Sequence, residues 1–239
     1  KIQKCIDNME LQGLKYSTIK TYLIKIHTAF NYAIKPLKII AENPIKDLDI
    51  ITPKEDTNKK ALTKAELDDL LNKIKNKKYR MISYIAGKCG LRIGEILGLT
   101  WDRIDFKNRI IKIDRQWKLL KDGSYGFGQL KSKNSYREIP FSSNVKKELE
   151  EYKKLYPINI DNRLFSFKSR KSISSTLIGC DISVHELRHT YATTLIANGV
   201  DFKTVAYLMG HDVEQTIHTY AHVTKDMLKN ATEKINKIF

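Results

Sequence analysis

Apolar side chains recur every three or four residues along much of the chain, which is the spacing that places them on one face of an α-helix. The clearest stripe follows Ser17, a favourable helix-capping residue, and consists of Ile19, Tyr22, Leu23, Ile26, Ala29, Phe30 and Ala33. Gly13 ends the segment before it, and Asn43-Pro44 is a typical stop signal. These features predict a small helical module over residues 1–51.

The chain from residue 61 onward predicts further helices. Two segments have the capping-box pattern in front of an apolar run, Thr63-x-x-Glu66 and Ser183-x-x-Glu186. In a capping box the first side chain and the fourth satisfy free backbone N–H groups at the start of a helix. Glycine ends two of the predicted helices, at Gly199 and Gly210, and the other helical stretches are 81–99, about 143–155 and 224–238.

Residues 104–140 have a different pattern. Apolar residues such as Ile111 and Ile113 alternate with polar neighbours, and Asp122-Gly123 is a turn signal. We expect a small antiparallel sheet of two or three strands. The predicted fold class is therefore α+β and mostly α. It comprises a small helical domain (1–51), a polar linker (52–60) and a helical domain that carries the sheet (61–239).

The charge of the chain indicates the class of its partner. Lys and Arg together number 43 against 27 Asp and Glu, which gives a net charge of +16 and a pI near 9.6. Such an excess favours nucleic acid as a partner. An AT-rich genome would explain why Lys outnumbers Arg but not the net excess. No apolar run approaches the ~20 residues that cross a bilayer, so a membrane protein is excluded.

The chain ends and the cysteines add two expectations. The start of the sequence has no signal-peptide pattern, so we expect no signal peptide in it. It opens with Lys1 and not with Met, so we expect that a segment preceded it. Cys5, Cys89 and Cys180 are far apart and form no CxxC pair. They exclude a disulfide framework and favour the reducing cytoplasm.

Several polar residues are candidates for anion binding. Arg92 stands in Gly-Leu-Arg-Ile-Gly-Glu95, at the start of a helix. His185 and Arg188 share one face of the first turn after the Ser183 cap, where backbone N–H groups and the helix dipole favour an anion. The simpler alternatives are a salt bridge from Arg92 to Glu95 and an ordinary polar surface turn at 185–188.

The segment from His185 to His189 also matches H-E-x-x-H, the signature of zinc proteases. The two histidines are four residues apart, as two zinc ligands on a helix would be. However, the extended signature requires Gly and His where this chain has Ala192 and Leu195, and Glu214 lacks the surroundings of a third ligand. A zinc hydrolase is therefore a remote alternative, and we predict no metal site.

Taken in order, three separated motifs resemble those of the tyrosine recombinase family, the phage and transposon integrases. They are Gly-Leu-Arg92-Ile-Gly-Glu95, His185-Glu-Leu-Arg188, and Gly-His211 followed nine residues later by Tyr220. The segment from Lys131 to Pro140 resembles the basic hairpin of that family, and residues 17–48 resemble the last helices of its core-binding domain. The resemblance implies that residues 1–51 are a DNA-binding core-binding domain, truncated at its N-terminus, and that 61–239 form the catalytic domain.

The resemblance implies a reaction that cuts and rejoins DNA through a 3′-phosphotyrosyl intermediate, with no metal, ATP or other cofactor. Tyr220 would be the nucleophile, and His185 would accept its proton. Arg92 and Arg188 would bind the phosphate oxygens, and His211 would donate to the same phosphate.

Three supporting assignments accompany these. Glu95 is expected to orient Arg92 or hold the helix start without touching DNA. Lys131 would protonate the leaving 5′-oxygen, with Lys133 as the alternative because the sequence does not fix the register of this hairpin. His189 is interpreted as a packing residue or a DNA contact, not as a catalytic residue.

The function implied is a site-specific recombinase that integrates and excises a phage or conjugative transposon in the bacterial cytoplasm. The implied partners are double-stranded DNA, three further copies of the chain that assemble through helix 224–238 into a tetramer, and an excisionase or a host DNA-bending protein. The alternative within the family is a chromosome-dimer resolvase of the Xer type. A catalytically silent DNA-binding protein is more remote, because every residue of the motif set is present.

Overall fold

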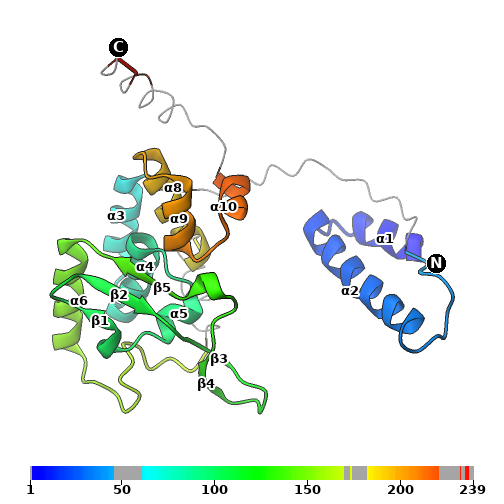
Figure 1. Ribbon diagram of the computed structural model, residues 1–239, viewed down its shortest axis with the longest axis horizontal. Coiled ribbons are helices and arrows are strands. Elements are labelled where there is room, and N and C mark those ends of the chain that lie inside the picture. The colour runs from blue at the N-terminus through cyan, green and yellow to red at the C-terminus, as the bar shows by residue number, and fades with distance from the viewer. Residues whose placement is uncertain are drawn as a thin grey trace. The chain divides into compact units, whose positions relative to one another are not determined.

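The computed structural model describes residues 2–45, 61–169 and 182–220, together with Ile173, Thr232, Ile235 and Asn236. The chain divides into two compact units, residues 1–58 and 59–239 (Figure 1). The predicted linker, 52–60, lies outside the described residues, as does most of the predicted helix 224–238.

The described part of the first unit, residues 2–45, contains two helices, α1 (Ile2–Leu11) and α2 (Tyr16–Ile34). They are joined through Gly13, which has a positive φ of 72°, and their contact buries Ile6, Ile19 and Leu23. The prediction that Ser17 caps the second helix is wrong, because α2 starts two residues earlier than that cap would place it and its N-cap is Lys15. Lys15 has the extended backbone of a cap position but makes no capping hydrogen bond with its side chain. A search for capping residue types therefore cannot find this helix start.

The second unit is built around α4 (Lys77–Cys89), whose residues 81–87 are all buried. Among the described helices, α4 packs most extensively against α8 (Val184–Ala197) and also contacts α3 (Lys64–Lys73) and α6 (Ser143–Leu155). The stretch predicted as one interrupted helix, 81–99, is in fact two. Gly90 adopts a left-handed conformation with φ 70°, and a short helix, α5 (Ile93–Leu97), begins after it.

The described strands form two sheets where one small sheet of two or three strands was predicted. The first has the order β1 (Ile104–Asp105), β2 (Ile110–Ile113), β5 (Arg137–Pro140), and both pairs are antiparallel. The second is the hairpin of β3 (Gln116–Leu119) and β4 (Tyr125–Gly128), which projects beyond the first sheet (Figure 1). The hairpin was not predicted as a separate sheet, because none of the residues in its two strands is buried and the sequence therefore has no inward-facing apolar side to mark it.

The helices that follow the sheet include α9 (Phe202–Met209) and α10 (Val213–Tyr220), in addition to α6 and α8. The predicted boundaries of α6 agree with the structure, and both predicted capping boxes are present, at the start of α3 and of α8. Helix α10 was not predicted, because its buried residues are only Thr216 and Tyr220 and do not form an apolar stripe. None of the described helices combines the length and the apolar character that a membrane span requires.

Candidate active site

Arg92 and Glu95 form the start of α5. The left-handed turn at Gly90 ends α4, and Arg92 becomes the N-cap residue of the new helix. The carboxylate of Glu95 accepts hydrogen bonds from the backbone N–H and from Nη1 of Arg92, both at 2.9 Å. Glu95 is only 3% exposed, so a carboxylate is fixed inside the protein at the N-terminus of a helix.

Two further arginines reach the same carboxylate. Arg137, on β5, donates from Nη1 and Nη2 to the two carboxylate oxygens at 3.0 and 2.9 Å, and its guanidinium is fully buried. Arg188, on α8, places Nη1 3.9 Å from Oε2 of Glu95. Burial by itself would raise the pKa of Glu95, but the bonds and charge of Arg137 and the charges of Arg188 and Arg92 outweigh it and hold the pKa near 2. Three guanidinium groups thus share one carboxylate, which leaves an excess of positive charge.

The arginines are also fixed by the C-terminal end of α9. Each donates to one of three consecutive backbone carbonyl groups: Arg137 to Leu208, Arg188 to Met209 and Arg92 to Gly210. The last carbonyls of a helix have no partner within it and carry partial negative charge, so they suit guanidinium donors. Gly210 has φ 60°, and a Cβ there would lie about 3.0 Å from Nη1 of Arg137 and 3.1 Å from Nη1 of Arg92. Glycine therefore permits the close approach of both side chains.

His211 follows directly and joins this cluster. Its Nε2 lies 3.1 Å from Nη2 of Arg188, and because a guanidinium can only donate, Nε2 is the acceptor. Burial, followed by the positive charges of Arg188 and Arg92, lowers the pKa of His211 to about 3, so the ring is neutral at physiological pH. The remaining proton is then on Nδ1, which is buried and has no hydrogen-bond partner among the described residues.

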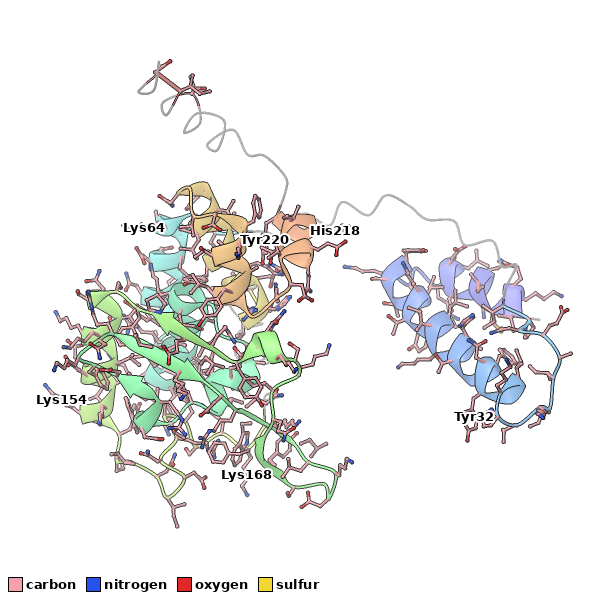
Figure 2. All side chains as sticks on the ribbon, viewed as in Figure 1. Tyr32, Lys64, Lys154, Lys168, His218 and Tyr220 are labelled. Atoms are coloured by element: carbon pink, nitrogen blue, oxygen red, sulfur yellow. The ribbon has the colours of Figure 1, made fainter. Side chains whose placement is uncertain are left out.

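Tyr220 is the last residue of α10. Its hydroxyl is 2.5 Å from Nδ1 of His189, and the side chain is 3% exposed. Figure 2 shows Tyr220 within the body of the unit, whereas His218 of the same helix lies at the outer edge. Burial raises the pKa of Tyr220 to about 12, and the charge of Arg188 opposes that shift. The hydroxyl is therefore protonated in the resting structure.

The structure brings together Arg92, Arg188 and His211, with Tyr220 beside them. Of the other predicted residues, Glu95 lies at the centre of this cluster, and His185, Lys131 and Lys133 are exposed at its margin. His185 is exposed and packs its ring edge-on against that of His189, with 4.5 Å between centroids.

Lys131 and Lys133 are both exposed on the segment between β4 and β5. That segment is close to the site, because Asn134 donates a hydrogen bond to Asp212, the residue after His211. Its carbonyl oxygen also lies 3.2 Å from where a Cβ on Gly210 would be.

Two residues of this site were not assigned roles from the sequence. Arg137 was noted only as part of the hairpin motif, although its position two residues before Ile139 placed it on the inward face of a strand. His189 was interpreted as packing or as a DNA contact. Its four-residue spacing from His185 indicated only a possible zinc motif. Nothing in the sequence indicated its contact with Tyr220, which is 31 residues away.

The zinc alternative has no support in the described residues. Among them there is no group of three or more His, Cys, Asp or Glu side chains that could hold a metal ion.

Comparisons with known proteins give one family. The sequence model of the phage integrase family matches residues 60–227. A tyrosine recombinase XerC-like protein of Caldanaerobacter subterraneus is 27% identical over 276 residues, which cover 100% of this chain and 70% of that protein. The transposase from transposon Tn916 of Enterococcus faecalis is 29% identical over 263 residues, which cover 96% of this chain and 64% of that protein.

Among solved structures, the Tn1549 transposon integrase in complex with a circular intermediate DNA has a TM-score of 0.75 and 26% identity. The similarity covers 97% of this chain and 83% of that one. This chain spans 64 to 70% of the length of the two curated relatives named above.

The neutral state of His211 predicts a pH dependence of stability. The folded pKa of about 3 is below the ordinary value of 6.5, so the unfolded chain binds a proton that the folded chain does not. The stability that His211 contributes through this difference in proton binding is fully present above pH 6.5. It is lost progressively as the pH falls from 6.5 towards 3, because the unfolded chain then binds the extra proton. We expect urea unfolding of His211→Gln to show a smaller loss of stability between about pH 7.5 and pH 5 than the wild type shows.

The matched control is His218→Gln, which removes an exposed histidine from the helix that follows. This variant should keep the full wild-type loss. A decline in His211→Gln as steep as in the wild type would contradict the buried neutral state.

Proposed function

We propose that this chain, which belongs to the phage integrase family of tyrosine recombinases, cuts and rejoins DNA as the main part of a site-specific integrase. The family resemblance predicted from the motifs is therefore confirmed. The named relatives favour a mobile element, because they include a Tn916 transposase and a Tn1549 integrase bound to a circular intermediate DNA. Integration and excision of such an element, in a bacterial cytoplasm, is the function we assign.

A chromosome-dimer resolvase is the second candidate. It is supported by the XerC-like relative, whose similarity extends over the whole of this chain. The two candidates differ in substrate, so recombination of plasmids carrying element ends, compared with plasmids carrying a chromosomal resolution site, would separate them.

One observation carries the proposed chemistry. Arg92, Arg188 and His211 meet at the end of α9, where three guanidinium groups share the single carboxylate of Glu95. The uncompensated positive charge and the Nδ1 donor of His211 together suit a phosphodiester. The Arg92 side chain is 35% exposed, so a phosphate can reach it from solvent. Tyr220 lies close enough for the charge of Arg188 to influence its hydroxyl.

The roles we propose follow from this arrangement. Tyr220 attacks the phosphorus and becomes joined to the 3′ end, while Arg92 and Arg188 neutralise the charge that develops on the non-bridging oxygens. His211 donates to one of those oxygens. Glu95 touches no DNA and holds the arginines in place. The leaving 5′-oxygen receives a proton from Lys131, on the exposed segment before β5.

The nucleophile is tested by Tyr220→Phe. A DNA duplex with a nick near the cleavage site releases a short fragment after cleavage, which traps the covalent complex. We expect the wild type to form an adduct that survives denaturation and the phenylalanine variant to bind the same DNA without forming one. Tyr207→Phe is the matched control, because it removes a hydroxyl from the neighbouring helix α9, and it should still form the adduct. An adduct formed by Tyr220→Phe would mean that another residue attacks.

The proposed acid is tested with a 5′-bridging phosphorothiolate, whose sulfur leaves without a proton. We expect Lys131→Ala to cleave ordinary DNA roughly 10²-fold or more slowly than the wild type does. The same variant should cleave the phosphorothiolate at close to the wild-type rate. Lys133→Ala is the matched control from the same segment and should cleave both substrates normally. If Lys133→Ala is the variant that the sulfur rescues, the acid lies two residues further along.

We also propose that four copies assemble on two DNA sites through the segment 224–238. The support is the helical spacing of its apolar residues, which are Met227, Leu228, Ala231, Ile235 and Ile238. We expect deletion of 224–239 to leave binding to a single DNA site intact and to abolish pairing of two sites in a gel-shift or mass-photometry assay. Pairing at the wild-type level after the deletion would refute this assembly.

An excisionase or a host DNA-bending protein is the further partner we propose. Recombination that occurs only when such a protein is added would support it.

A further inference from the structure

The structure places the side chain of His189 against the hydroxyl of Tyr220. His189 lies four residues after His185, the proton acceptor that the family resemblance implies. The distance from the Tyr220 hydroxyl to Nδ1 of His189 is 2.5 Å, which is short for a hydrogen bond between an oxygen and a nitrogen. The ring centroids are 5.4 Å apart. His185 is exposed, and its ring contacts the ring of His189.

The surroundings of this pair favour a specific contact over incidental packing. Both side chains are nearly inaccessible to solvent, with Tyr220 3% and His189 4% exposed. The tyrosine ring belongs to an apolar cluster formed with Ala192, Ile196, Val205 and Met209. A buried hydroxyl in such a place needs a hydrogen-bond acceptor, and His189 supplies it.

The position of His189 on α8 also links it to the phosphate-binding cluster. It directly follows Arg188, so of two successive residues on one helix the first is proposed to bind the phosphate and the second contacts the proposed nucleophile. Consecutive helical positions are ~100° apart around the axis, which lets the two side chains face different groups. A rigid helix that carries both residues fixes their geometry relative to each other.

We propose that His189 positions the hydroxyl of Tyr220 and accepts its proton during DNA cleavage. This inference rests on the function proposed above. In the step, the O–H bond of Tyr220 breaks and its proton moves to Nδ1 of His189. The oxygen forms a bond to phosphorus, and the bond from phosphorus to the 5′-oxygen breaks, with a proton from the lysine going to that oxygen. The tautomer required carries its hydrogen on Nε2. Rejoining reverses each of these movements.

Two variants of the full chain test the proposal on the nicked DNA duplex. His189→Leu keeps a similar volume and removes the acceptor. His189→Asn places a side-chain oxygen near the former position of Nδ1, where it can hold the hydroxyl but cannot take the proton. General-base catalysis contributes typically 10²–10⁴-fold. We therefore expect adduct formation by the leucine variant to be slower by about 10²-fold or more, and the asparagine rate to lie between that and the wild-type rate.

A second substrate separates this role from a structural one. A DNA strand that ends in a 3′-p-nitrophenyl phosphate is attacked by the 5′-hydroxyl of a neighbouring strand and releases coloured nitrophenolate. This reaction uses the phosphate-binding residues and not Tyr220, so both variants should perform it within about twofold of the wild-type rate. Tyr220→Phe should do the same.

Three results would overturn the proposal. The first is adduct formation by His189→Leu at or above the wild-type rate, since the contact would then be irrelevant or would restrain the nucleophile. The second is an asparagine variant as fast as the wild type, because proton acceptance would then be unnecessary. The third is an equal loss on the nitrophenyl substrate, which would indicate a general disruption of the site. Failure of the wild type itself to form an adduct would instead refute the proposed function.

Discussion

The buried carboxylate of Glu95 is the group on which the rest of the site depends. A carboxylate removed from water is stable only if it is paired and fully hydrogen-bonded. Here it accepts from the backbone and side chain of Arg92 and from both terminal nitrogens of Arg137, while Arg188 lies within ionic distance. The same contacts fix the first turn of α5 and the inward face of β5, and they bring α8 next to both. Loss of the carboxylate would leave three buried or half-buried cations facing one another.

The end of α9 is the second anchor of these cations. Its three last carbonyl groups each accept from one arginine, so the guanidinium planes are held from two sides. Burial, and after it the positive charge that remains, keeps His211, the next residue, neutral, because protonation would add a further cation to a partly desolvated cluster. The free enzyme is therefore prepared for an anion, with donors already oriented and one of them, Nδ1 of His211, without a partner in the described structure.

Helix α8 separates two environments that the proposed reaction requires at the same time. On the side of Arg188 the surroundings are cationic and suit a phosphate. On the side of His189 they are apolar, and burial there keeps the hydroxyl of Tyr220 protonated, with its pKa near 12. The proposed nucleophile needs a proton acceptor in contact with it, and His189, whose Nδ1 contacts the hydroxyl, is the residue we propose for that role.

The sequence by itself determined the elements with strong local signals and the family. The capping boxes at Thr63 and Ser183 and the bounds of α6 follow from short-range side-chain and backbone interactions, and the motif order identified the family from residues that need not be placed in space. Local pattern did not reveal helix α10, the start of α2 or the separation of the two sheets. Only the tertiary structure decided which buried polar groups meet. Arg137 and Glu95 are 42 residues apart, and His189 and Tyr220 are 31 apart. Periodicity reports that a side chain faces inward, but its partner depends on how distant elements pack, and that packing is set by the whole core.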